Sequence, residues 1–219
     1  MKKRRIFRNL NDKEFAWVLY DVGNSAYTML ACALIPIWFK AMAIGTKPGQ
    51  LTSDRATAYY SMAIAVITIV VALLGPVCGA ISDYKGMKKI FFTSTVAVGV
   101  CGCILNGFAC QWIVFLLLFA ATKIFYNMSL MFYDSMLNDI TTEERMDEVS
   151  SYGYAWGYLG SCIPFLIALV AYVFGPDMVG IISGKLSMAI GFAVTGLWWL
   201  LVTVPLINRS ITWKRKNMQ

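Results

Sequence analysis

Residues 90–133 read IFFTSTVAVGVCGCILNGFACQWIVFLLLFAATKIFYNMSLMFY, and Lys123 carries the one charge among them. A transmembrane helix takes about 20 apolar residues, so this stretch is too long for one span and fits two. We place the turn between them near residues 107–111, with Trp112 anchoring the second helix at the membrane interface. The stretch therefore predicts two transmembrane helices, roughly 90–110 and 112–137.

Uncharged runs elsewhere in the chain hold one further span each. Together they predict an all-α fold, a polytopic membrane bundle over residues 16–207 between basic tails at residues 1–15 and 208–219. Hydrophobic residues make up 58% of the chain and charged residues 14%, against about 25% charged in a typical soluble domain. This composition excludes an ordinary soluble globule and indicates an integral membrane protein. Six transmembrane helices are expected, at residues 16–40, 57–81, 90–110, 112–137, 150–174 and 186–207.

Lys and Arg residues are concentrated on one side of the expected bundle. They crowd both tails and the connections that contain Lys88 and Arg145, whereas few lie in the opposite connections. Basic connections stay in the cytoplasm, so both termini are expected there, as in a bacterial inner-membrane protein. The net charge of +7 then reflects orientation in the lipid bilayer. No nucleic-acid partner is expected, because the basic residues share no folded face.

The chain lacks the residues that most metal sites and many catalytic centres use. It has no His, and its six cysteines fall within or at the ends of the expected spans, without a metal-ligand spacing. Thiols at such positions are typical of small packing residues. We therefore expect no metal, no cofactor and no enzymatic activity.

Polar residues within the expected spans gather on two helix faces. At 100° per residue, Asp21, Asn24 and Thr28 share one stripe of the first helix. Lys123 and Asn127 share one face of the fourth. An ionisable group at membrane depth costs at least about 2.5 to 3.5 kcal/mol unless it is paired or hydrated, so such residues usually face the bundle interior or a water-filled cavity. We expect these residues to bind a solute, with Lys123 pairing with its carboxylate; the alternative is a structural polar network that only packs the helices.

Two other helices carry patterns that predict their packing. Gly153, Gly157 and Ser161 recur every four residues along the fifth helix, and small side chains at this spacing permit close helix packing. The sixth helix has few polar side chains, Thr203 among them, and each can bond its own backbone. We expect the fifth helix to pack closely against a neighbour and the sixth to face lipid.

The connection between the second and third expected helices carries a recognisable pattern. Residues 79–89 read GAISDYKGMKK, which resembles the loop between helices two and three of the major facilitator superfamily, with Tyr84 where a basic residue is usual. The resemblance implies a gate built from this loop, in which an Asp meets the N-terminus of a helix in the other half of the fold. The gating residues that it implies are Gly79, Asp83, Gly86, Lys88 and Lys89.

Three further segments narrow the resemblance. Residues 17–27 read WVLYDVGNSAY, residues 132–140 read FYDSMLNDI and residues 150–160 read SSYGYAWGYLG. They are similar to the vacuolar amino-acid effluxer-like branch of the superfamily, although Asp134 stands where Asn is common and Asn138 where Pro is common. The resemblance implies a secondary transporter that moves a small solute by alternating access, amino acids being one substrate class.

The resemblance covers half of the superfamily fold, the six-helix N-terminal half with its 3+3 inverted repeat. We expect the N-terminal half of a longer or split transporter, or a chain that pairs with an identical copy, because the two halves of the fold are parallel repeats. The leading hypothesis is a small-solute carrier, active as a homodimer or with a partner half. The alternative is a transport-incompetent membrane interaction protein or an orphan N-terminal half. In a homodimer Asp83 is expected to meet residues 149–151 of the other copy, unless it only caps its own loop.

Overall fold

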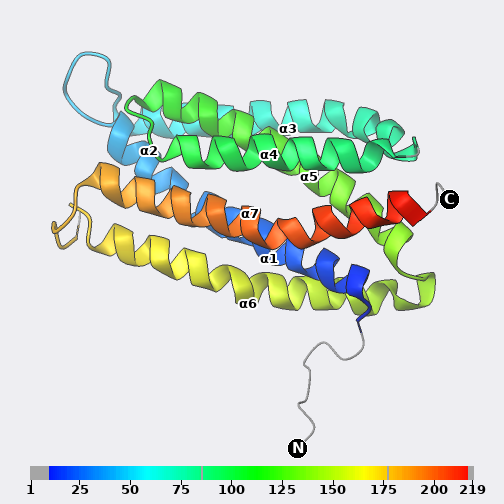
Figure 1. Ribbon diagram of the computed structural model, residues 1–219. Coiled ribbons are helices and arrows are strands. Elements are labelled where there is room, and N and C mark those ends of the chain that lie inside the picture. Colours follow the sequence, from blue (N-terminus) through cyan, green and yellow to red (C-terminus); the bar gives the residue numbers. More distant parts are fainter. Residues whose placement is uncertain (1–9, 85, 177, 217–219) are drawn as a thin grey trace, which may run out of the picture.

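The computed structural model describes residues 10–84, 86–176 and 178–216, and within these ranges the chain is helical apart from turns and an isolated bridge between Ile44 and Leu51. The predicted all-α fold is confirmed (Figure 1). The helices are α1 (Asp12–Ala33), α2 (Ile35–Ala43), α3 (Ser53–Asp83), α4 (Met87–Asn106), α5 (Trp112–Ile140), α6 (Met146–Val173) and α7 (Gly184–Lys216), with a short 3-10 helix, η1 (Glu143–Arg145), before α6.

Five of these helices, α3 to α7, are long and apolar enough to cross a membrane. α1 and α2 pass the same test only as a pair, bent by 41° where they meet at Leu34. Pro36 lies in the first turn of α2, and its missing N–H interrupts the backbone hydrogen bonds that would continue one helix through this point. The span expected at residues 16–40 is therefore a bent pair of helices.

The ends of the bundle differ from the expected tails. α1 begins at Asp12 because Asn11 and Glu14 form a capping box: the Asn11 side chain accepts from the Glu14 N–H (3.0 Å), and the Glu14 carboxylate accepts from the Asn11 N–H (2.7 Å). Residues 12–15 are thus helical. α7 continues to Lys216, because residues 206–216 contain neither Gly nor Pro. The outermost residues of both expected tails, 1–9 and 217–219, lie outside the described residues.

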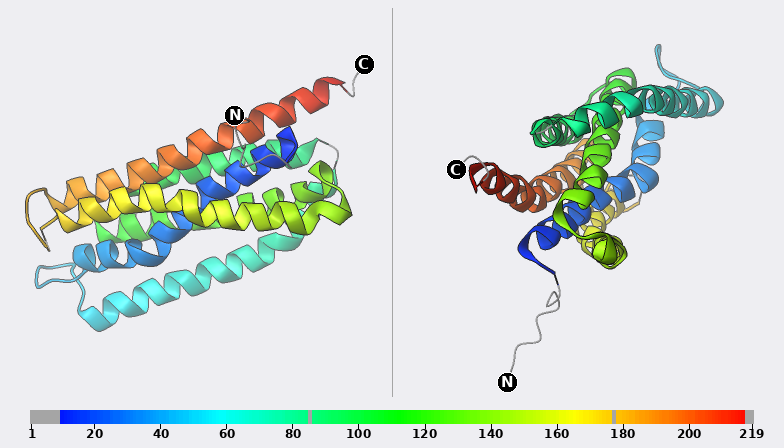
Figure 2. Two further views of the ribbon diagram at one scale, coloured as in Figure 1. Left: turned by 90° about the horizontal axis from the view of Figure 1, so that it is seen from below. Right: turned by 90° about the vertical axis from the view of Figure 1, so that its right-hand side faces the viewer.

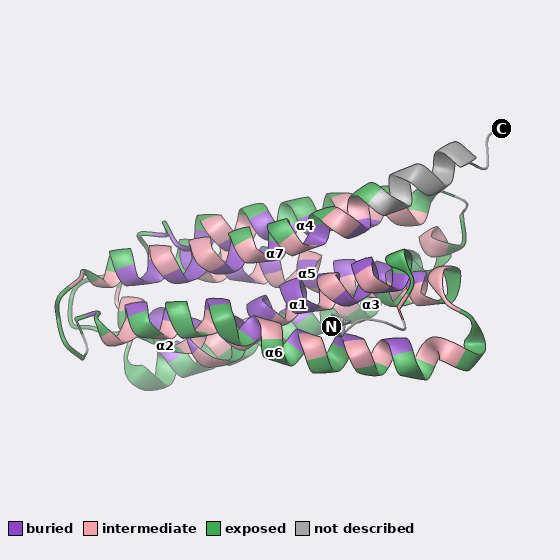
Figure 3. Ribbon diagram, turned by 60° about the horizontal axis from the view of Figure 1, so that its bottom comes forward, coloured by how far each residue is buried: buried purple, intermediate pink, exposed green. Residues whose placement is uncertain are grey.

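Helices α1, α6 and α7 all pack against one another. α4 contacts α5 and α7, and α3 packs mainly against α5 (Figure 2). Burial follows these contacts, because the helix faces that meet are buried and the outer faces are exposed (Figure 3). The exposed faces carry large apolar side chains such as Leu73 on α3 and Leu201 on α7, which suits a bundle surrounded by lipid.

The expectation that the last helix faces lipid is wrong for one of its sides. α7 packs against α1, α4 and α6, and both Trp199 and Thr203 are fully buried. The Thr203 hydroxyl donates to the backbone carbonyl of Trp199 (2.6 Å), so its polar group is satisfied within its own helix and can face protein as well as lipid. Gly99 of α4 makes room for the indole, since a Cβ there would lie 2.7 Å from Trp199.

Candidate functional site

A cavity of about 470 Å³ opens between α1, α5 and α6. Asp21, Asn24 and Thr28, which were predicted to bind a solute, all line it. Their common position follows from their shared stripe on α1. The sequence therefore located the α1 wall of this cavity.

The polar groups of this wall are held by short-range contacts. The Asn24 side-chain amide donates to Asp21 Oδ1 (3.1 Å), and Asn24 itself is buried. The Thr28 hydroxyl is hydrogen-bonded to the Tyr126 hydroxyl of α5. These bonds fix the side chains that face the cavity and connect α1 to α5 across it.

Glycines of α6 allow α1 to approach so closely that Asp21 of α1 lies against the α6 backbone. A Cβ at Gly157 would lie 3.0 Å from Asp21 Oδ2 and 3.0 Å from Ser25 Oγ, and one at Gly153 would lie 2.9 Å from the Trp17 ring. Further along the helix, the Ser161 hydroxyl contacts the Met29 sulfur (3.0 Å). The prediction that this small-residue stripe permits close packing is confirmed, and the helix it serves is α1.

Lys123 and Asn127 do not line the cavity. The Lys123 ammonium lies over the Tyr126 ring (4.6 Å to the centroid) and near the Tyr27 ring (5.7 Å), where the aromatic faces stabilise a positive charge. The Asn127 amide donates to the Lys123 carbonyl (2.8 Å) within α5. Tyr126, which does line the cavity, thus stands next to both the ammonium and the α1 wall.

Aromatic side chains complete the cavity, and sequence reasoning missed them. The Trp17 and Tyr133 rings are stacked with centroids 4.3 Å apart, and the Trp17 indole N–H donates to the Tyr133 carbonyl (3.1 Å). Tyr154 and Tyr158 of α6 also line the cavity and are mostly exposed. Their signal was the i, i+4 spacing of Ser150, Tyr154 and Tyr158, which places all three on one face of α6.

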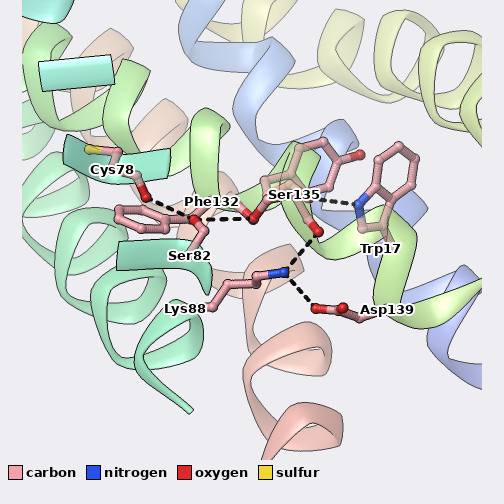
Figure 4. A network of polar contacts seen from close by, with 8 residues as sticks. Trp17, Cys78, Ser82, Lys88, Phe132, Ser135 and Asp139 are labelled. Atoms are coloured by element: carbon pink, nitrogen blue, oxygen red, sulfur yellow. Dashed lines mark hydrogen bonds and ion pairs between the residues drawn. The ribbon is translucent and has the colours of Figure 1, made fainter. Parts of the chain in front are cut away.

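The residues implied as a gate lie at one end of the bundle, and the structure assigns them different positions. Gly86 has a φ of +85° and precedes α4, a left-handed conformation that glycine adopts without strain. The Lys88 ammonium donates to the Ser135 carbonyl (3.0 Å) and pairs with Asp139 (2.7 Å) (Figure 4). Lys88 therefore ties the start of α4 to the C-terminal end of α5.

Two of the other gate residues, Gly79 and Asp83, are exposed. Asp83 is exposed at the end of α3 and has no hydrogen bond or ion pair with the residues that the structure describes. A Cβ at Gly79 would meet nothing within 4 Å. Lys89 is half-buried at the start of α4. The outer face of this end of α3 is thus free to receive another surface.

A buried carboxylate that sequence reasoning missed lies at the start of α1. Glu14 is 1% exposed, pairs with Arg145 of η1 (3.2 Å) and accepts from the Thr141 hydroxyl (2.8 Å). Together with the Asn11 cap, these contacts fasten α1 to the connection between α5 and α6. Its sequence signal was the capping-box spacing of Asn11 and Glu14.

Comparison with known proteins adds an independent line of evidence. Neither a family model nor a solved structure matches the chain. The chain is 34% identical to an uncharacterized MFS-type transporter, YxiO, of Bacillus subtilis (strain 168). The match covers 206 residues, which are 93% of this chain and 47% of the relative. This similarity supports membership of the major facilitator superfamily. The apolar helices and the relative together indicate an integral multi-pass membrane protein. The chain spans about half the length of that curated relative.

Proposed function

We propose that the chain works as part of a secondary transporter of the major facilitator superfamily and moves a small solute across the membrane by alternating access. The observation that carries this proposal is the polar cavity between the membrane-spanning helices α1, α5 and α6. Its polar groups would be costly at membrane depth without water or a solute to contact. The similarity to an MFS-type transporter supports the same function.

The solute contacts Asp21, Asn24 and Thr28 on α1, and Lys123 and Asn127 on α5 extend this site beyond the cavity. Lys123 pairs with the carboxylate of a bound solute. Its ammonium lies near aromatic rings, and among the described residues it has no ion pair that would compete with the solute. Amino acids are the substrate class that the segments at residues 17–27, 132–140 and 150–160 favour.

A second half completes the carrier, either an identical copy or a separate chain. Two six-helix halves with the same orientation are parallel repeats, so a second copy can insert without inversion. Both termini then lie in the cytoplasm, where the basic connections are expected. The exposed Asp83 and Gly79 suit a contact with the other half at this end of α3.

The gate forms where Asp83 meets the N-terminal end of α6 in the other half, near residues 149–151. Unpaired backbone N–H groups at a helix N-terminus favour a carboxylate by about 0.3 to 1 kcal/mol. In a symmetric dimer two such contacts close the cytoplasmic side and open as the solute crosses.

Uptake into liposomes tests the proposed function. Vesicles that contain only this chain should accumulate at least one of the radiolabelled amino acids above the level of empty vesicles. No uptake of any amino acid by a folded, reconstituted chain would favour the alternative, a membrane interaction protein without transport activity.

A further inference from the structure

The cavity is lined by two acidic side chains and by no basic one. The acidic residues are Asp21 of α1 and Asp134 of α5. Asp21 accepts a hydrogen bond from the Asn24 amide, whereas Asp134 has no hydrogen bond with any residue that the structure describes. Neither carboxylate is in an ion pair among those residues. A bound cation would supply the missing counter-charge.

The aromatic lining favours the same kind of ligand. Trp17, Tyr126, Tyr133, Tyr154 and Tyr158 contribute five rings to the cavity wall. The faces of such rings attract ammonium and guanidinium groups, the more strongly when water is excluded. Tyr154 and Tyr158 of α6 are the exposed aromatic residues of this lining, so their rings can lie against an organic cation whose charge is balanced by the two carboxylates.

A buried polar group is also left for the ligand. Tyr133 is 3% exposed and lines the cavity, yet its hydroxyl has no hydrogen-bond partner among the described residues. Buried hydroxyl groups are normally hydrogen-bonded. The unpaired hydroxyl thus belongs to a residue of the cavity lining.

Other ligand classes fit less well. A metal ion needs several oxygen, nitrogen or sulfur ligands, and no group of three or more His, Cys, Asp or Glu residues comes together in the described part of the chain. A neutral solute would leave both carboxylates without a counter-charge. A hollow of about 470 Å³ has room for an organic molecule of some ten heavy atoms or more.

We propose that this cavity binds the cationic group of an organic solute, an alkylammonium, quaternary ammonium or guanidinium group, with Asp21 and Asp134 as its counter-charges and the exposed rings of Tyr154 and Tyr158 against it. The inference names the substrate class of the site in the proposed function and rests on that proposal only for the claim that binding leads to transport. A zwitterion can satisfy both assignments, with its cationic group in the cavity and its carboxylate on Lys123.

Equilibrium binding to the purified chain tests this inference. Radiolabelled choline and agmatine should bind, and unlabelled 3,3-dimethylbutan-1-ol, the neutral isostere of choline, should not compete. The double variant D21N/D134N should lose at least about tenfold in affinity, because the charged partners of the cation are removed. Asp54→Asn, at the exposed start of α3 and away from the cavity, is the matched control and should bind as the parent chain does.

A second variant covers the event that the double variant fails to fold. Tyr154 is 66% exposed, so Tyr154→Ala should fold normally and lower choline affinity several-fold. Absence of binding of both cations, effective competition by the neutral alcohol, or unchanged affinity in a folded double variant would overturn the inference. Because binding is measured without transport, a chain that binds cations but moves no solute contradicts the proposed function alone.

Discussion

Asp21 lies against Gly153 and Gly157 of α6, so the cavity depends on two residues that have no side chain. Gly157→Ala should lower the free energy of unfolding by about 1–3 kcal/mol, because its Cβ would lie 3.0 Å from both Asp21 Oδ2 and Ser25 Oγ and would push α1 from α6. Thermal unfolding in detergent measures this. Gly79→Ala is the control for stability: its Cβ meets open space, so it should unfold no earlier than the parent chain. Equal melting of all three proteins would contradict the close approach of α1 and α6.

Substitution of Lys123 tests whether this side chain binds the solute. Lys123→Ala should reduce amino-acid uptake into liposomes by about tenfold or more, the effect of losing roughly 1.4 kcal/mol of binding, while the protein stays folded. Lys47→Ala, in the exposed connection between α2 and α3, is the control and should transport normally. Unchanged uptake without Lys123 would reject its role in solute binding.

At the residue scale, the polar wall of the cavity could be read from the sequence and its aromatic wall could not. Asp21, Asn24 and Thr28 stand out in an apolar helix, and helix geometry places them on one face. Trp17, Tyr133 and Tyr154 do not stand out, because aromatic side chains occur on lipid-facing, interfacial and packed surfaces alike. Only the contacts between helices show which of these surfaces each ring occupies.

At the scale of elements, the contact of Glu14 with Arg145 fastens α1 to η1. Arg145→Ala should destabilise the protein by about 1–3 kcal/mol, because it removes a charged partner of a buried carboxylate whose remaining partners are the Thr141 hydroxyl and the Asn11 N–H. Thermal unfolding provides the measurement. Glu148→Gln removes only the exposed partner of Arg145 (3.5 Å) and should change stability by less than about 1 kcal/mol. Equal destabilisation by both substitutions would show that the buried pair of Glu14 and Arg145 stabilises the protein no more than the exposed pair does.

The sequence predicted the existence of the elements better than their packing. Long uncharged runs define helices because a membrane span must be apolar along its whole length. The length and apolar character of these runs do not determine the bend between α1 and α2 or the burial of one side of α7. Thr203 bonds its own backbone and so fits either lipid or protein. Trp199 packs against Tyr27, Gly99 and Tyr126, which are distant from it in the sequence.

At the scale of the whole molecule, the proposed gate requires a second half. In a chain freed of its own cysteines, one tagged copy carries Asp83→Cys and a differently tagged copy carries Ser150→Cys. If the homodimer forms the gate, the two copies should cross-link efficiently when the carrier is open to the outside. The control pairs Ser150→Cys with Ser53→Cys, which lies at the other end of α3 and should not cross-link. Absence of the 83–150 cross-link in every condition would reject the homodimeric gate.

The central claim, that the cavity between α1, α5 and α6 belongs to an alternating-access pathway, is tested most directly by the accessibility of a cysteine within it. Thr28→Cys in the cysteine-free chain, reconstituted in sealed vesicles, is exposed to a membrane-impermeant maleimide from one side or the other. Lys47→Cys, in a connection between spans, should react from one side only and reports that the vesicles are sealed and oriented. If the carrier alternates its access, the cysteine at position 28 should react from both sides. Labelling of that cysteine from a single side, like the control, would contradict this claim.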